Sequence, residues 1–105
     1  MGYNQMKELK INPQVYDDLV DIRNYIAEDS AEQATKVIQA ILSDMEKLRD
    51  FPDMGAHLSN KVHIDAKYRY LITYSYATVY YSDEDFVYIT TVLHLERDFA
   101  AISFK

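Results

Sequence analysis

Cysteine is absent from the 105-residue sequence, so no disulfide bond can stabilise the chain. A chain of this length buries roughly two thirds of its unfolded surface as a single domain and does not need such cross-links. We therefore expect one domain over residues 1–105, with residues 1–5 as a loose leader. The absence of cysteine also fits a reducing compartment, and we expect a cytoplasmic protein.

Long hydrophobic runs are missing as well. No segment approaches the ~20 consecutive apolar residues that cross a bilayer. The first ten residues, MGYNQMKELK, lack the apolar core of a secretory signal peptide. The sequence thus predicts a soluble protein with no membrane partner.

Glycine is nearly absent, since Gly2 and Gly55 are the only two. A glycine-rich phosphate loop is therefore excluded, and neither a G-x-S-x-G nor an H-E-x-x-H motif occurs. His57 and His63 lie close in the sequence, but we identify no further residues that complete a metal-ligand set around them. We expect no cofactor and no metal site.

Basic residues are outnumbered, with 11 Lys and Arg against 17 Asp and Glu and a net charge of −6. Residues 1–57 carry 11 acidic and 6 basic residues, whereas residues 58–105 carry 6 and 5. Phosphate binding depends on clusters of Lys and Arg. We therefore expect no strong binding to free nucleic acid, although one local basic site remains compatible with these counts.

Aromatic and β-branched residues concentrate between residues 68 and 98. They form three strand-like segments, of which the last two are joined by an acidic turn at residues 83–85: Tyr68–Thr73, Tyr76–Ser82 and Phe86–Leu95. Short connections make such strands antiparallel neighbours. In the last segment both sets of alternating residues are largely apolar, which predicts a central strand covered on both faces. Packing explains most of the ten tyrosines without a role in stacking on bases.

A first amphipathic helix is predicted from Asn12 and Pro13 to about Glu28. Asparagine caps helix starts, and proline is tolerated at the first helical position. Apolar residues then recur at helical spacing on one face: Val15, Leu19, Ile22 and Ile26.

A second helix follows almost at once, because residues 30–33 (SAEQ) have the form of a capping box. Its apolar stripe runs to about Arg49: Ala34, Ile38, Ile41, Met45 and Leu48. Pro52 prevents its continuation. Two such helices joined by one or two residues form a helical hairpin, whose apolar faces must be covered by the sheet.

Three further segments carry weaker signals. Met6–Ile11 alternates apolar and charged residues and is predicted to be a first strand. Lys61–Ile64 is predicted to be a short strand that leads into the sheet. The apolar segment Phe99–Phe104 is either a last turn packed on the sheet or a segment that binds a partner.

Together these segments predict an α+β fold, in which a helical hairpin packs on a twisted, mostly antiparallel sheet. Both helical stripes are expected to face the sheet, and eight residues are expected to be buried: Leu19, Ile22, Ile38, Ile41, Met45, Val79, Ile89 and Leu93.

Three polar residues at strand ends form the candidate site. Arg69, His94 and Arg97 would supply two fixed cations and one group that titrates near neutral pH, the parts needed to cleave RNA through its own 2′-hydroxyl. In the alternative interpretation the arginines pair with Asp98, Glu96 or a helix acid, and His94 caps a strand end. Charges at strand ends are usually solvated or paired, which favours this alternative.

Several short motifs, in this order, resemble the RelE/ParE superfamily of toxins from type II toxin–antitoxin modules. They are Asp17-Asp18-Leu19 to Tyr25-Ile26-Ala27, Phe51-Pro52-Asp53-Met54-Gly55, Tyr68-Arg69-Tyr70-Leu71, Val79-Tyr80, Val92-Leu93-His94 and Arg97-Asp98. The likeness covers roughly Lys7 to Asp98 and is closer to the ParE side. It implies a β-α-α-β-β-β fold and a cognate small antitoxin that wraps the toxin.

The resemblance also implies two possible mechanisms. RelE-like toxins cut mRNA on the ribosome with a basic strand, an arginine and a residue such as histidine near the end of the sheet, whereas ParE-like toxins are similar to known poisons of DNA gyrase. Here residues 62–67 (VHIDAK) contain one lysine and one aspartate, which argues against ribonuclease activity.

We therefore expect a ParE-like toxin that binds a protein target, with DNA gyrase as the candidate target and Arg69 and Arg97 as target-binding residues. One alternative is a ribosome-dependent mRNA endonuclease with Arg69, His94 and Arg97 as catalytic residues. The other is an interaction module of the same fold without toxicity.

Overall fold

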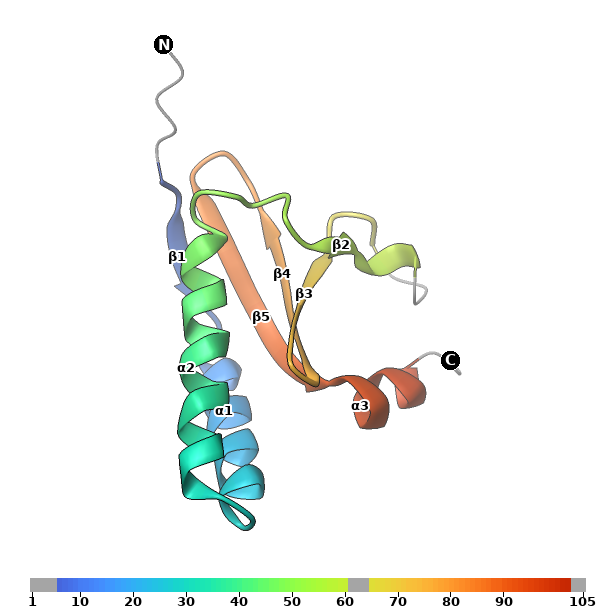
Figure 1. Cartoon of the computed structure of the whole chain (residues 1–105). Coiled ribbons are helices and arrows are strands. Elements are labelled where there is room, and N and C mark those ends of the chain that lie inside the picture. The colour runs from blue at the N-terminus through green and yellow to red at the C-terminus, as the bar shows by residue number, and fades with distance from the viewer. Residues whose placement is uncertain (1–5, 61–64, 103–105) are drawn as a thin grey trace.

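The computed structural model describes residues 6–60 and 65–102. Its elements follow one another in the order seen in Figure 1: β1 (Glu8–Ile11), α1 (Pro13–Ala27), α2 (Ala31–Lys47), β2 (Ala56–His57), the 3₁₀ helix η1 (Leu58–Asn60), β3 (Arg69–Thr73), β4 (Tyr76–Ser82), β5 (Phe86–His94) and α3 (Leu95–Ile102). The predicted leader and the predicted strand at residues 61–64 lie outside the described residues. No helix in the described part is long and apolar enough to cross a membrane.

The two long helices begin where the capping signals place them. The Asn12 side chain accepts a hydrogen bond from the Gln14 amide (2.9 Å), and the Ser30 hydroxyl accepts one from the Gln33 amide (3.1 Å). Both helices end within about two residues of the predicted positions. They pack against each other and cover one face of the sheet, so the predicted helical hairpin is confirmed (Figure 1).

The sheet has five strands in the order β1-β5-β4-β3-β2. β1 runs parallel to β5, and the other neighbours are antiparallel. The prediction of an α+β fold with a mostly antiparallel sheet is confirmed, and so is the central position of β5. The two-residue strand β2 was not predicted. The helix α3 begins at the last residue of the segment predicted as the third strand and extends to Ile102, into the segment Phe99–Phe104 where a last turn was one of the two expectations.

The main core lies between the hairpin and the sheet, and its most completely buried members include Val15, Ile41, Tyr80 and Val87. Six of the eight residues predicted to be buried are buried, at 9% exposure or less: Leu19, Ile22, Ile41, Met45, Val79 and Ile89. The prediction was wrong for Ile38 and Leu93, which are only partly buried because each packs at the margin of a cluster.

A smaller cluster covers the opposite face of the sheet and is formed by Leu58, Tyr70, Ala77 and Val79. A β-bulge in β5 changes which residues of this strand face the helices. Val79 pairs with Thr91 and the next residue of β4 pairs with Ile89, so β5 has one additional residue at this point. The bulge shifts the alternation of side chains between the two faces of the sheet by one residue. His94, at the end of β5, therefore lies on the side of the sheet that carries α1.

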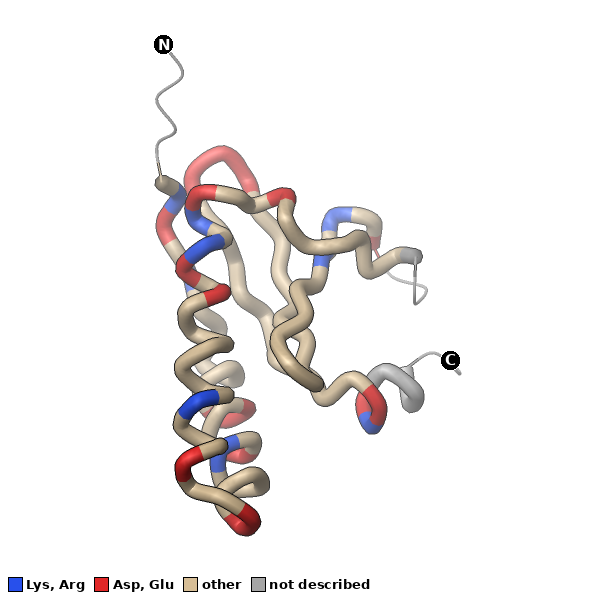
Figure 2. The backbone as a smooth tube through the Cα atoms, in the orientation of Figure 1, with Lys and Arg blue, Asp and Glu red and all other residues tan. Residues whose placement is uncertain are grey.

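Charged residues lie mainly on the helices and turns, whereas β4 and β5 contain none (Figure 2). The acidic excess that the sequence assigns to residues 1–57 therefore belongs largely to the helical layer.

Candidate functional site

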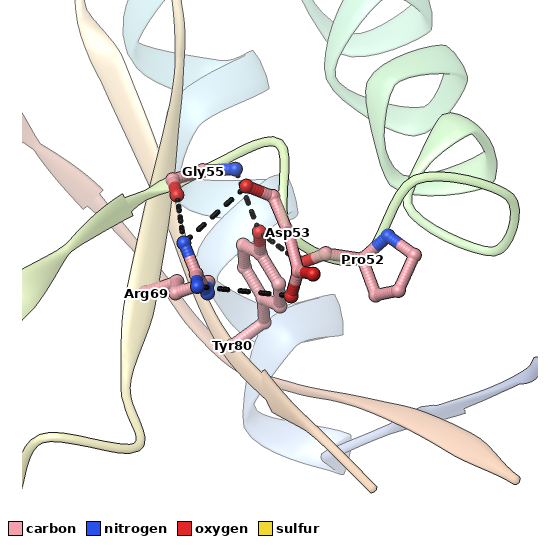
Figure 3. A network of polar contacts seen from close by, with 5 residues as sticks. All are labelled: Pro52, Asp53, Gly55, Arg69 and Tyr80. Carbon is pink, nitrogen blue, oxygen red and sulfur yellow. Dashed lines mark hydrogen bonds and ion pairs between the residues drawn. The ribbon is translucent and has the colours of Figure 1, made fainter. Parts of the chain in front are cut away.

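Arg69, the first of the three candidate residues, lies at the start of β3 and contacts the loop after α2 (Figure 3). Its Nη1 donates hydrogen bonds to the carbonyl oxygens of Gly55 (2.7 Å) and Asp53 (3.3 Å). Its Nη2 lies 3.7 Å from the Asp53 carboxylate. The partner of Arg69 is thus a loop acid, and not Asp98, Glu96 or an acid of a helix.

Tyr80, on the neighbouring strand β4, binds the backbone of the same loop (Figure 3). Its buried hydroxyl accepts a hydrogen bond from the Gly55 amide (2.8 Å) and donates one to the Pro52 carbonyl (2.7 Å). Burial raises the pKa of Tyr80, which keeps the phenol neutral. We call Arg69 and Tyr80, together with the backbone of residues 52–55, the loop clamp.

Glycine is required at position 55 because the clamp leaves no space for a side chain. A Cβ atom there would lie 2.6 Å from the Tyr80 hydroxyl oxygen and 2.7 Å from the Tyr70 carbonyl oxygen. The Phe-Pro-Asp-Met-Gly motif therefore has a packing function. Its glycine lets the loop lie directly on the sheet, where the two strand residues bind its backbone.

The sheet does not bring Arg69 together with His94 and Arg97. Arg69 pairs with Tyr80 across β3 and β4, whereas His94 pairs with Tyr76 at the other end of β4. Four residues of strand separate the two positions by about 13 Å along the strand direction, and two strand spacings add to this separation. The three residues predicted as one cluster therefore lie at opposite ends of the sheet.

His94 forms the cap of helix α3. Its Nδ1 accepts a hydrogen bond from the Arg97 amide (3.2 Å), and its own amide donates one to the Asp98 carboxylate (2.7 Å). This reciprocal arrangement resembles a capping box and satisfies two backbone donors at the helix start. With Nδ1 as an acceptor, the neutral imidazole carries its proton on Nε2.

Arg97 pairs with the residue that follows it. Its Nε lies 3.1 Å from one oxygen of the Asp98 carboxylate, and its Nη2 lies 3.4 Å from the other. The hydrogen bond to Asp98 raises the pKa of Arg97. Partial burial opposes ionisation of Asp98, but the hydrogen bonds from Arg97 and from the His94 amide lower its pKa overall. Arg97 is thus neutralised locally, as the alternative interpretation predicts.

A cleft of about 370 Å³ opens between α1 and the junction of β5 with α3. We call it the α1–α3 cleft, and its lining comprises Gln14, Asp18, Asp21, Ile22, Tyr25, Tyr76, Thr91, Val92, Leu93, His94, Arg97 and Asp98. Asp18 closes one wall, since its Oδ2 accepts hydrogen bonds from the Thr91 hydroxyl (2.8 Å) and the Val92 amide (3.0 Å). The charged lining is predominantly acidic, with three carboxylates and one guanidinium.

Sequence reasoning did not identify the helix residues Asp18, Asp21 and Tyr25, nor Tyr76, as part of this site. Helical spacing places the three α1 residues beside one another, next to the apolar stripe, and this signal was available. Their position opposite His94 depends on how α1 packs on β5, which the sequence does not specify. No group of three His, Cys, Asp or Glu side chains within the described residues is arranged to hold a metal ion.

Comparisons with known proteins agree with this architecture. Residues 9–99 match the family described as the ParE toxin of type II toxin–antitoxin systems, parDE. A solved structure described as the chromosomal ParDE toxin–antitoxin system from P. aeruginosa shares the fold, with a TM-score of 0.70 and 21% sequence identity over 87% of this chain and 98% of that one. No match was found among curated protein sequences. Because the family match spans most of the chain, the protein belongs to the ParE toxin family of type II toxin–antitoxin systems.

Proposed function

We propose that this protein acts as a toxin by binding a protein target, with DNA gyrase as the candidate target, and that a cognate small antitoxin neutralises it. Family membership supports the toxin role and the existence of an antitoxin. The observation that carries the mode of action is the separation of Arg69 from His94 and Arg97, because it divides the residues that an RNA-cleaving site would need.

The charge around His94 also supports action without RNA cleavage. A phosphodiester-cleaving site must bind a polyanion and stabilise the negative charge that develops in the transition state. Of the described residues that line the α1–α3 cleft, Arg97 is the one arginine and is paired with Asp98, while Asp18 and Asp21 add two further carboxylates. A scissile phosphate placed beside His94 would therefore meet net negative charge.

Arg69 and Arg97 differ in how accessible their guanidinium groups are to a target protein. Arg69 uses its guanidinium to hold the loop after α2, and 23% of its side chain is exposed. The Arg97 side chain is 69% exposed, and within the part of the chain that the structure describes its guanidinium is bound only by its neighbour Asp98. We therefore assign direct contact with the target to Arg97 and an indirect, supporting role to Arg69.

An antitoxin segment could add to the sheet at β1, which is its outer strand on one side. The backbone of such a strand offers hydrogen-bonding groups to a partner. Co-expression from the native operon should give a complex of both proteins. Recovery of this protein alone in active form would contradict the antitoxin part of the proposal.

The mode of action is tested by expressing the protein without an antitoxin. Two kinds of damage are then mapped in the same cells, namely cleaved mRNA ends on translating ribosomes and DNA breaks linked to gyrase. We expect DNA breaks with intact mRNA, and inhibition of purified gyrase in a plasmid supercoiling assay. Cleavage of mRNA at fixed codon positions would instead establish the endonuclease.

One observation keeps the endonuclease as the second candidate, namely that His94 and Arg97 share one cleft. His94→Asn is the informative variant, because asparagine retains a side-chain acceptor for capping α3 but removes the imidazole. General acid–base catalysis raises a reaction rate by roughly 10²–10⁴-fold. A loss of mRNA cleavage of this size in His94→Asn would therefore identify His94 as catalytic. Unchanged toxicity in this variant would support the protein-binding mechanism.

A further inference from the structure

The α1–α3 cleft contains more negative charge than its own residues neutralise. Arg97 is engaged with Asp98, which leaves the carboxylates of Asp18 and Asp21 without a cation among the described residues. Asp18 accepts two hydrogen bonds through Oδ2, and its Oδ1 accepts none from a described residue. Asp21 is exposed and makes no hydrogen bond or ion pair within the described part of the chain.

A second observation, independent of the acids, also points to a ligand. Tyr76 as a residue is 94% buried, lines the cleft and makes no hydrogen bond with any described residue. Its hydroxyl oxygen is not among the fully buried atoms that lack a partner, so a ligand in the cleft can reach it. The ring of Tyr76 packs edge-on against His94, with 5.3 Å between the centroids, so its position is fixed while its hydroxyl retains hydrogen-bonding capacity.

The third feature is the arrangement of side chains on α1. Asp18 and Asp21 are three residues apart, and Tyr25 follows Asp21 by four, so the three side chains lie along one face of the helix. Tyr25 is 63% exposed at the mouth of the cleft. This face offers two carboxylates beside an aromatic ring, and the Tyr76 hydroxyl lies in the wall opposite.

We propose that the α1–α3 cleft binds an arginine side chain presented by a partner protein. The inference rests on the proposed function in that the partner is a protein. The guanidinium would pair with Asp21 and the free oxygen of Asp18, donate to the Tyr76 hydroxyl and stack on the ring of Tyr25.

Arginine fits this site better than lysine for geometric reasons. The planar guanidinium carries five donors in a fixed fork and stacks on aromatic rings, whereas the ammonium of lysine is a compact point charge. Two carboxylates, one hydroxyl and one ring provide acceptors and a stacking surface for the fork. An anionic ligand is disfavoured, because Asp18 and Asp21 would repel it.

The test is a titration of the full-length purified protein with N-acetyl-arginine-amide as the probe. Binding is measured by NMR as changes in the amide chemical shifts of the protein. We expect saturable shifts confined to residues 18–25 and 91–98, with a dissociation constant on the order of 1–10 mM for so small a ligand. N-acetyl-citrulline-amide, which has nearly the same shape without the charge, should cause no saturable shifts. The lysine analogue should bind several-fold more weakly.

Matched variants assign the binding to the cleft. Asp21→Asn should weaken binding of the arginine probe by about five- to tenfold, as expected for the loss of one charge-assisted contact. Asp17→Asn removes the same charge from the same helix outside the cleft, and it should leave binding unchanged. Tyr76→Phe should weaken binding without a change in the pattern of shifts.

Three results would overturn the proposal: no saturable shifts in the cleft, equal binding of the citrulline analogue, or equal weakening by Asp17→Asn and Asp21→Asn. Equal affinity for the lysine analogue would overturn the assignment to arginine. Because the measurement needs no toxicity and no gyrase, failure here is distinguishable from failure of the proposed mode of action.

Discussion

Tyr76 and Tyr80 provide a comparison between the two ends of the sheet. Both lie on β4, face the helical layer and are at least 94% buried. Tyr80 makes two hydrogen bonds to the loop after α2, whereas Tyr76 makes none with a described residue. The same side chain, four positions apart, thus satisfies its hydroxyl within the fold at one end and leaves it available in a cleft at the other.

The two arginines differ in the same way. Arg69 binds residues 14 and 16 positions away, and these contacts fix the path of the loop. Among the described residues, the Arg97 guanidinium binds only the adjacent Asp98. Contacts between distant residues stabilise the fold, whereas a pair of neighbours on the surface contributes little and can be rearranged by a partner. The comparison indicates that the loop-clamp end is structural and that the cleft end is available for binding.

Truncation of the core that supports both ends should have the largest effect. Ile41 is fully buried in α2, and Ile41→Ala should lower the free energy of unfolding by about 2–5 kcal/mol. Leu42→Ala, at an exposed position of the same helix, should change it by less than about 0.5 kcal/mol. Chemical denaturation measures both values. A cost below ~0.5 kcal/mol for Ile41→Ala would contradict the packing of α2 on the sheet.

The comparison of the two tyrosines is tested directly by removing each hydroxyl. Tyr80→Phe leaves the Gly55 amide and the Pro52 carbonyl without their partner, and it should destabilise the protein by about 1–3 kcal/mol. Tyr76→Phe should change stability by less than about 0.5 kcal/mol. Thermal or chemical denaturation of the two variants side by side provides the measurement. Equal costs would remove the distinction between the two ends.

Arginine substitutions should show a smaller difference in the same direction. Arg69→Met keeps the aliphatic length but removes the donors to Gly55 and Asp53, and it should cost about 1–2 kcal/mol. Arg97→Met should leave the denaturation midpoint nearly unchanged, because the Arg97 side chain is largely exposed and, within the described residues, pairs with its sequence neighbour alone. Hydrogen exchange of the Gly55 amide should accelerate in the first variant and not in the second.

The smallest expected effect concerns pH. The pKa of Asp98 is lowered in the folded state, so the unfolded chain binds a proton more readily at this residue. The stabilisation is therefore fully present above the unfolded value of about 3.9, and it is lost as pH falls through the lower folded pKa. Protection factors of the amides at the start of α3, which correct for the intrinsic pH dependence of exchange, should fall over this acidic range.

Asp98→Asn is the control for this pH dependence. The variant retains a side-chain oxygen that can accept the His94 amide, but it has no proton to gain. Protection factors at the start of α3 should therefore change less with pH in the variant than in the wild type. An identical acid response in both proteins would assign the effect to other carboxylates.

The helices could be predicted from the sequence because their signals are local. Asn12 and Ser30 each cap a helix through a residue two or three positions away, and the apolar stripes repeat every three or four residues. The parallel pairing of β1 with β5 has no such signal. It joins segments that are far apart in the chain, and its register follows from tertiary packing.

The error in the candidate site has a topological cause. Successive antiparallel strands reverse direction, so the start of the first strand and the end of the third lie at opposite ends of a three-stranded sheet. Arg69 stands at the first of these positions and His94 at the second. The predicted strand order therefore already separated them. The pairing of Arg97 with Asp98 was predicted because it requires only neighbours in the sequence.

The parallel pairing of β1 with β5 also sets a minimum time for the protein to acquire its shape during synthesis. β1 ends at Ile11 and β5 begins at Phe86, so the intervening 74 residues must be translated before the first strand meets its neighbour. At about 5–20 residues per second this takes roughly 4–15 s. Throughout that interval Leu9 and Ile11 have no strand to pair with, and both helices lack the surface that covers them. The nascent chain therefore presents none of its folded binding surfaces until the central strand has left the ribosome.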